Sequence, residues 1–419
     1  MKRHSLNLLW VGGVFLACLH AAAPAAAWSL PQTLLAAERY SAELSANRNQ
    51  ANALNSMAQS ARELPDPSLK FGVENVPLGG SNARRLTRDG MTMQRIGIMQ
   101  NYVSADKRER KAETLLAQSS STQAQSDVIR AALQRDTASA WLELALSQKM
   151  LRAAQRLARE TEKQTGAQLS GVASGASPAS SVLDLRIALN AIRDRVTLAQ
   201  RDVELAQTRL LALTGQNIVQ TDGDMPRYQR LPADEALLEQ AVSRHPQVIA
   251  AAREADVSRA RSAQSAVAAK PDVGVEVYYA HRADGYDDMA GIMFSVDLPL
   301  FKSQRQDKDY AADVSRTLEA NDRLALVERE RLAQLKSLIA RYQAALAIWQ
   351  RQQQDVVPLT RQRLALLEAR YRSGQSDVAA LLEARRAVLD SEVAAISAEK
   401  ELALNWAAIR YLVPEELTQ

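Results

Sequence analysis

The chain has 419 residues, of which 47% are hydrophobic but only 5% aromatic, with a single Cys and four His. The lone Cys18 excludes a disulfide framework and a Cys-rich metal site, and four His exclude a multi-histidine centre. The formal net charge of +4 arises from charges of both signs mixed along the chain, so nucleic-acid binding is not expected. The abundance of Ala, Leu, Gln, Arg and Glu favours long helices.

The N-terminus has the layout of a secretory signal peptide. A basic pair at residues 2–3 precedes an apolar run from Leu6 to Leu19. Ala25-Ala26-Ala27 then supplies an Ala-x-Ala cleavage site. We therefore predict that residues 1–27 are removed and that the mature chain begins at Trp28.

Cys18 offers an alternative end to this signal. It follows Phe15-Leu16-Ala17, so it is a candidate lipid anchor, although Phe15 fits a bacterial lipid-attachment motif poorly. No later segment has about 18 consecutive apolar residues, so no transmembrane helix is expected after the signal.

Two parts of the chain repeat one pattern. The segment Pro67 to Glu74 resembles Pro271 to Tyr278, roughly 200 residues later, and the turn at Gly175 resembles the turn at Gly374 at a similar offset. The predicted organisation is a first repeat (28–214), a linker (215–232), a second repeat (233–412) and a C-terminal tail (413–419).

Each repeat is expected to begin with a helix and two strands. The first helices are predicted over about 31–62 and 233–268, each ending at a proline-rich segment. Alternating apolar and polar residues then predict strands over about 68–76 and 91–103, and over about 272–280 and 289–300.

A long helix, a tight turn and a return helix complete each repeat. The long helices are predicted over about 106–169 and 304–371, each roughly 100 Å long at ~1.5 Å per residue. Pro358 is expected to kink or break the second one. Gly/Ser turns follow, and the return helices run to about Leu213 and Leu412.

The return helices carry a sustained heptad-like pattern. Apolar residues keep 3-4 spacing from Val182 to Leu213, and the same register recurs from Leu381 to Leu412. This pattern predicts coiled-coil packing. Because the two shorter helices of a repeat together match the long one, we expect them to stack end to end beside it. The strands would then lie at one end, the turns at the other, and the linker and termini near mid-length.

The four predicted strands cannot close a barrel within one chain. Strands of about ten residues in an exported chain match an outer-membrane barrel, whose edges must be paired in lipid. Single barrels begin at about eight strands, so oligomerisation is expected, and a trimer would supply 12. The alternative is a soluble α+β protein with two hairpins packed on helices.

Taken together, these parts resemble the TolC-type outer-membrane efflux channel family over essentially all of residues 28–419. The resemblance implies a mainly α fold with a small β part, in which a trimeric 12-stranded outer-membrane β-barrel continues into a periplasmic α-helical coiled-coil barrel. The motifs that carry it are Pro65-Asp66-Pro67, His245-Pro246-Gln247, Lys270-Pro271-Asp272, Leu298-Pro299-Leu300-Phe301, Tyr371-Arg372-Ser373-Gly374 and Leu382-Glu383-Ala384.

The same resemblance implies a function. A homotrimer embedded in outer-membrane lipid would be the passive exit duct of a tripartite efflux system. It would act with a periplasmic adaptor and an inner-membrane transporter of the resistance-nodulation-division type. The stretch Leu64 to Leu78 is most similar to the heavy-metal cation branch, either cobalt–zinc–cadmium or copper–silver. Two alternatives stay open: a type I protein-secretion exit channel, and a periplasmic coiled-coil scaffold without a pore.

The resemblance also implies entrance residues near the turns. Glu383 matches a position where acidic side chains ring the periplasmic entrance, whereas Ala380 stands where a second acid is often found. Asp184 is the equivalent of Glu383 in the first repeat; the alternative is that these are solvated helix charges paired with Arg186 or Arg385.

Tyr371 matches a tyrosine that helps hold the closed state, although its partner region Ser180-Ser181 lacks the family's Asp. An exposed turn tyrosine is the competing interpretation. The candidates for adaptor docking are turn residues: Gly175, Gly374, Gln375 and Ser376.

The methionines gather in the predicted strands. A soft-metal relay is one interpretation, but ordinary apolar barrel residues are favoured because Met is a normal hydrophobe. We find no catalytic motif and expect no enzymatic activity, cofactor or metal site. The residues concerned are Met91, Met93, Met99, Met289 and Met293.

Overall fold

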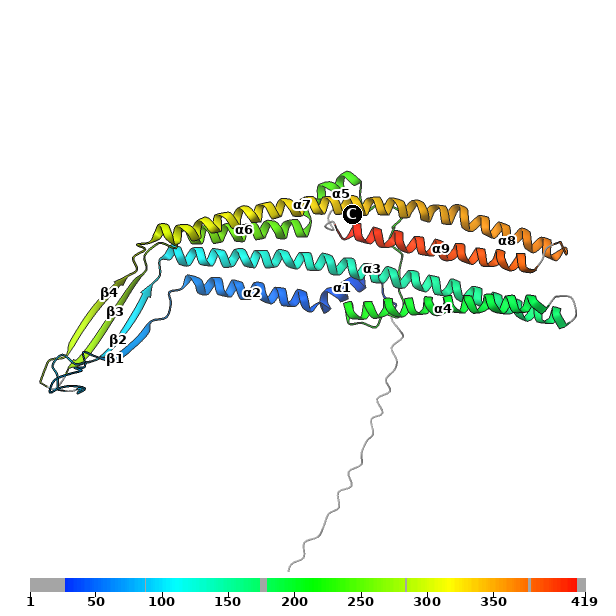
Figure 1. Ribbon diagram of the computed structural model, residues 1–419. Coiled ribbons are helices and arrows are strands. Elements are labelled where there is room, and N and C mark those ends of the chain that lie inside the picture. Colours follow the sequence, from blue (N-terminus) through cyan, green and yellow to red (C-terminus); the bar gives the residue numbers. More distant parts are fainter. Residues whose placement is uncertain (1–26, 87, 174–178, 283–284, 376–377, 413–419) are drawn as a thin grey trace, which may run out of the picture.

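The computed structural model describes residues 27–86, 88–173, 179–282, 285–375 and 378–412. These residues form a long layer of helices with a four-stranded sheet at one end and helical turns at the other (Figure 1). No helix in the described ranges is both long and apolar enough to cross a membrane. Cys18, Gly175 and Ser376 lie outside these ranges, as does the tail 413–419.

The first half of the chain contains four helices and two strands among its described residues. The helix predicted over 31–62 is two helices, because Ser41 adopts an extended conformation and its Oγ accepts the N–H of Leu44. A serine that caps a new helix in this way ends the preceding one. The elements are α1 (Leu30–Tyr40), α2 (Ala42–Arg62), β1 (Ser68–Glu74), β2 (Met93–Tyr102), α3 (Ala105–Ala173) and α4 (Ala179–Thr214).

The second half begins with another divided helix. The helix predicted over 233–268 breaks at His245, because a residue before proline avoids the helical conformation. The elements are α5 (Glu235–Ala241), the 3-10 turn Val242–Arg244, α6 (Pro246–Ala266), β3 (Val273–Arg282), β4 (Met289–Val296), the 3-10 turn Lys302–Gln304, α7 (Gln306–Arg351), the π-helical turn Gln352–Val356, α8 (Val357–Arg372) and α9 (Val378–Arg410).

Pro358 distorts the second long helix without ending it. The π-helical turn Gln352–Val356 lies immediately before α8, and Pro358 occupies the first turn of α8. A wide turn makes room for the proline ring and for the carbonyl that loses its N–H partner. The expected local disturbance is therefore present, as a bulge in a helix that keeps its direction (Figure 1).

The helices pack as two long rods, each flanked by two shorter helices. α2 and α4 lie end to end along α3, while α6 and α9 lie end to end along α7 and α8 (Figure 1). The predicted coiled-coil seams are confirmed: Leu185 and Leu210 of α4 and Leu402 and Ile409 of α9 are buried. The two halves meet where α3 contacts α6 and α9.

The largest apolar cluster lies near mid-length, where the shorter helices end. Trp141 and Tyr342 are fully buried there, and the Trp141 indole N–H donates to the Trp28 carbonyl at 2.8 Å. Trp28 also forms a parallel bridge with Thr221 in the linker. The mid-length position expected for Trp28 and for the linker is therefore confirmed.

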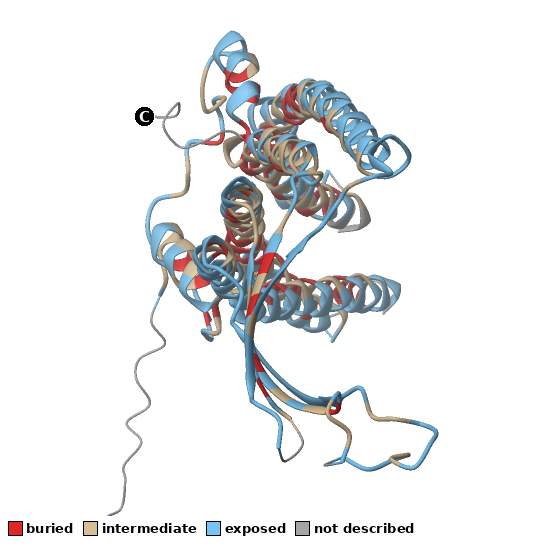
Figure 2. Ribbon diagram, turned by 90° about the vertical axis from the view of Figure 1, so that its left-hand side faces the viewer, coloured by how far each residue is buried: buried red, intermediate tan, exposed pale blue. Residues whose placement is uncertain are grey.

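The sheet is antiparallel throughout, in the order β1-β2-β3-β4. β1, β2 and β4 are shorter than the predicted strands, and β3 extends to Arg282. The strands are largely exposed on both faces, whereas buried residues line the contacts between helices (Figure 2). β1 and β4 are edge strands, so within the described chain each has one unpaired side.

Ion pairs fix the sheet to the helices. The Asp272 carboxylate, just before β3, accepts the Ser104 N–H at 3.1 Å and Lys107 Nζ at 2.9 Å. Partial burial acts to raise the pKa of Asp272, but the Lys107 and Ser104 donors hold it below its ordinary value. Lys270 pairs with Asp106 beside them, so the starts of α3 and β3 are tied by two reciprocal bridges.

Candidate functional site

The register of the sheet divides the strand residues cleanly by charge. Leu69, Ile98, Val277 and Ile292 face each other across the four strands and so lie on one face. No residue of this apolar face within the four strands is Asp, Glu, Lys or Arg. Its members are Leu69, Phe71, Val73, Gln94, Ile96, Ile98, Gln100, Tyr102, Val273, Val275, Val277, Tyr279, His281, Ala290, Ile292, Phe294 and Val296.

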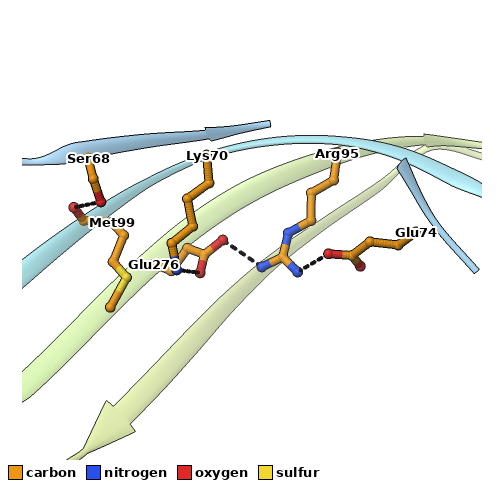
Figure 3. Close-up of polar contacts among 6 residues, drawn as sticks. All are labelled: Ser68, Lys70, Glu74, Arg95, Met99 and Glu276. Carbon is orange, nitrogen blue, oxygen red and sulfur yellow. Dashed lines mark hydrogen bonds and ion pairs between the residues drawn. The ribbon is translucent and has the colours of Figure 1, made fainter. Parts of the chain in front are cut away.

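The opposite face, the charged face, carries every charged residue of the four strands. Its charged members are Lys70, Glu74, Arg95, Glu276 and Arg282. Figure 3 shows four of them converging from β1, β2 and β3. Glu276 accepts Lys70 Nζ at 3.1 Å and an Arg95 Nη at 2.6 Å, and Arg95 also pairs with Glu74 at 2.9 Å. The cluster therefore links three strands by alternating charges.

Glycines on the charged face leave room for Tyr278. A Cβ added at Gly291 would lie 2.5 Å from the Tyr278 ring, and one added at Gly97 would lie 2.8 Å from the Tyr278 Cβ. The ring thus lies close against the neighbouring backbones, and the Arg95 guanidinium stacks over it at 3.7 Å. Arg95 is held by two carboxylates and one aromatic ring.

The strand methionines also lie on the charged face. Met99 and Met293 stand on either side of Glu276 in the register, and Met93 and Met289 occupy the same face further along. Met91 precedes β2 and is exposed. The four strand methionines therefore lie on the face opposite the apolar one, and their interpretation as ordinary apolar residues of a barrel stays a prediction.

The second turn region is shaped by Gly374 at the end of α8. Gly374 has φ of 73°, its N–H donates to the Tyr371 carbonyl, and the Gln375 N–H donates to the Arg370 carbonyl. These two bonds form a Schellman cap, which requires a left-handed residue and so favours glycine. The tight turn predicted at Gly374 and Gln375 is present.

The acidic candidates near the turns are exposed. Glu383 on α9 and Asp184 on α4 have no ion pair with any described residue, and Arg385 instead pairs with Glu368 at 2.7 Å. Pairing with Arg186 or Arg385 therefore does not occupy these carboxylates. The Tyr371 side chain is half-buried near the end of α8.

A polar contact near the turns joins the hairpin formed by α3 and α4 to the hairpin formed by α8 and α9. Arg195 on α4 pairs with Asp390 on α9, which also lies 3.9 Å from Arg386. At mid-length the buried Glu399 accepts Lys149 Nζ and the Tyr228 hydroxyl, each at 2.6 Å. Burial, together with the bond to Glu399, raises the pKa of the Tyr228 hydroxyl well above its usual range.

Sequence reasoning missed the charged cluster of the sheet and the contacts of Asp390 and Glu399. Alternation in the strand pattern already places Lys70, Arg95 and Glu276 opposite the apolar residues, so that signal was available. The helix pairs depend on which helices become neighbours, which sequence spacing does not reveal. Among the described residues, no group of three His, Cys, Asp or Glu side chains is placed to hold a metal ion.

Comparison with solved structures identifies proteins that share this architecture. The chain is similar to CusC (14% identity, TM-score 0.77, covering 94% of this chain and 95% of CusC). It is also similar to VceC of Vibrio cholerae (17%, TM-score 0.72, 91% and 95%) and to the MtrE channel of Neisseria gonorrhoeae (16%, TM-score 0.73, 91% and 88%). No family model and no curated protein matches the sequence. The chain therefore has the fold of outer-membrane channels of the TolC type.

Proposed function

We propose that this protein is the outer-membrane exit channel of a tripartite efflux system. The observation that carries the proposal is the division of the sheet into an uncharged apolar face and a charged face. A lipid-exposed barrel needs one uncharged surface, and a water-filled lumen accepts the other. The charged cluster and the methionines would then line the lumen, and the channel would conduct passively without enzymatic activity.

The proposed assembly is a homotrimer with a 12-stranded barrel. Each protomer would be built from the two repeats, 28–214 and 233–412, joined by the equatorial linker 215–232. The open edges of β1 and β4 would pair between neighbouring protomers, which removes the edges that lipid does not tolerate.

The helical edges support the same assembly. α4 and α8 form the two edges of the helical layer in the half that runs from mid-length to the turns (Figure 1). Leu198 and Leu205 of α4 are exposed and seven residues apart, as are Leu359 and Leu366 of α8. A seven-residue spacing of exposed leucines is what a coiled-coil contact with another helix needs. The partner would be the opposite edge of the next protomer.

The remaining roles follow from this placement. The sheet would lie in the outer membrane, and the helices would extend about 100 Å into the periplasm. The turns at Gly175, Gly374, Gln375 and Ser376 would dock a periplasmic adaptor, and Glu383 and Asp184 would line the entrance with Tyr371 nearby. An inner-membrane transporter of the resistance-nodulation-division type would supply the substrates, either heavy-metal cations or small toxic compounds.

A matched pair of charge substitutions tests the division of the sheet. Val277→Lys puts a charge on the apolar face, and Ser295→Lys puts the same charge on the charged face of the neighbouring strand. The first should abolish membrane integration and conductance in planar bilayers, because a charge facing lipid costs about 2–4 kcal/mol at mid-depth. The second should keep both. A soluble protein without conductance, unaffected by either change, would instead favour a periplasmic scaffold.

A further inference from the structure

The loop between β1 and β2 is a long excursion at the end of the sheet away from the helices (Figure 1). Residues 75–86 and 88–92 are described, and they are tied together by their own hydrogen bonds. The Thr92 hydroxyl donates to the Asn75 carbonyl at 3.0 Å, which closes the base of the loop. The Arg84 N–H donates to the Pro77 carbonyl at 2.7 Å, and Arg84 has φ of 56°. The loop is thus a closed, internally bonded unit.

Three arginine side chains of this loop have no side-chain partner among the described residues. Arg84, Arg85 and Arg88 are exposed, and none forms an ion pair or a side-chain hydrogen bond with any described residue. Asp89, the one acid among the described loop residues, accepts the Met91 N–H at 2.9 Å and forms no ion pair with these arginines. By contrast, Arg282 at the same end donates to the Gly90 carbonyl and lies over the Tyr286 ring.

Exposed leucines accompany the arginines. Leu78 is 86% exposed and Leu86 is 47% exposed. These large apolar side chains stand beside three arginines that have no partner in the described part of the loop. Apolar side chains next to basic ones are typical of segments that sit at a membrane surface.

The choice of arginine indicates the ligand. All three cations are Arg, whose planar guanidinium binds phosphate oxygens in a bidentate manner, whereas Lys acts as a point charge. If the sheet spans the outer membrane, as in the proposed function on which this inference rests, the loop emerges at the outer surface. The lipids of that leaflet carry phosphates close to their acyl chains.

We propose that Arg84, Arg85 and Arg88 bind the phosphate groups of a phosphorylated glycolipid of the lipid A class, while Leu78 and Leu86 contact its apolar part. The site would hold the rim of the channel to the outer leaflet. A competing partner is the exposed Asp287, which precedes β4 and would approach this loop from the next protomer of a ring.

Lipid binding by the full mature protein in detergent tests the proposal. The probes are diphosphoryl lipid A, dephosphorylated lipid A, phosphatidylglycerol and inorganic phosphate, with bound lipid measured by native mass spectrometry. The loop variant is Arg84→Gln/Arg85→Gln/Arg88→Gln. The control variant removes three exposed mid-length charges through Arg227→Gln/Arg230→Gln/Arg244→Gln.

We expect the native protein to bind diphosphoryl lipid A at least tenfold more tightly than the other three probes. The loop variant should lose that preference at least tenfold, while the control variant keeps it. Equal binding by loop and control variants would overturn the proposal. The proposal would also be overturned if the loop variant still binds lipid A but its oligomer dissociates at a lower temperature. That result would mean that the arginines pair with Asp287 of the next protomer. Single-channel conductance of the native protein tests the channel separately, because a conducting channel with unaltered lipid binding refutes only the loop site.

Discussion

His245 shows how one buried side chain can make the fold sensitive to acid. It lies at the break between α5 and α6, is 7% exposed, and its Nδ1 accepts the Gln247 N–H at 3.1 Å. Burial, and then the nearby Arg331 guanidinium, lower the pKa of His245 from 6.5 to about 4. The imidazole is therefore neutral in the folded protein at pH values where an unfolded chain would be protonated.

The stability of the helical region should fall as the pH falls from 6.5 towards 4. Over that range the unfolded chain binds a proton that the folded chain does not. The neutral His245 contributes its full stabilisation above pH 6.5. Roughly 3 kcal/mol of that stabilisation is lost by the time the pH reaches about 4. His245→Asn keeps a helix-capping oxygen but does not titrate. Thermal unfolding followed by circular dichroism should show a smaller acid-induced fall for this variant; parallel curves would contradict the assignment.

The exposed carboxylates near the tip should act on ions in the channel. Neutralising them by Glu383→Gln with Asp184→Asn should lower cation selectivity without loss of the oligomer, because a ring of carboxylates concentrates cations. The effect should be strongest at low salt and fade as the Debye length shortens to ~8 Å near physiological ionic strength. Single-channel reversal potentials measure it. An unchanged cation preference at low salt would mean that these residues are solvated helix charges.

Single residues could be predicted from the sequence where a local rule applied. The turn at Gly374 followed from its composition. The faces of the strand methionines did not follow from their hydrophobicity, because Met side chains can fill gaps on either face. Met99, for example, lies where a Cβ on Gly274 would be 2.9 Å from its Cε.

In the proposed channel, the contact between α4 and α9 would bear most directly on opening among the contacts between helices. Few residues of these two helices approach one another, and Arg195 pairs with Asp390 across the gap. Both side chains are about two-fifths exposed, so the pair contributes at most about 1 kcal/mol. Such a link is strong enough to bias a gate and weak enough to be broken by a partner.

Removing this link should favour the open channel. Asp390→Asn should raise the open probability up to about fivefold, the factor that corresponds to ~1 kcal/mol. Arg195→Gln should have the same effect, and the double variant should add little because both changes break one contact. Arg193→Gln is the control, since it breaks a 2.8 Å pair with Glu162 inside one hairpin. Additive effects of the two single changes would refute a shared latch.

The helix spans were predictable, but their interruptions were only partly so. The uninterrupted α3 follows from a stretch with no proline and only two glycines, both near its C-terminal end. The break at His245 follows from the proline after it and was a local signal that the hydrophobic pattern concealed. The break at Ser41 was harder to predict, because serine also occurs inside helices and only its capping bond to Leu44 ends α1.

The dimensions of the chain bear on how its N-terminus is processed. Trp28 is held at mid-length, and α1 and α2 separate it from the sheet by roughly 50 Å of helix at ~1.5 Å per residue. The ten residue-to-residue steps from Cys18 to Trp28 span at most ~36 Å when fully extended. The backbone alone therefore falls short of the sheet, and the acyl chain of a lipidated Cys18 would have to span the remaining distance.

The mature protein should begin at Trp28. Cleavage after Ala27 leaves the Trp28 nitrogen free to keep its 3.1 Å hydrogen bond to the Gln220 carbonyl. Intact-mass measurement of protein purified from outer membranes should give the mass of residues 28–419 without an acyl group. A mature chain starting at an acylated Cys18 would contradict the cleavage site.

Disulfide trapping between edge strands tests whether three chains form the proposed closed ring. Cleavage after Ala27 would leave a chain without cysteine, so each trapped disulfide would come only from introduced residues. Phe71→Cys on β1 would be combined in turn with cysteine at Ala290, Ile292 or Phe294 on β4, all on the apolar face. Cysteines whose Cα atoms lie within about 7 Å can bridge. On oxidation in membranes, at least one pair should give covalent dimers and trimers and nothing larger on a denaturing gel. Monomers for every pair, or a ladder that continues beyond the trimer, would contradict the trimeric channel.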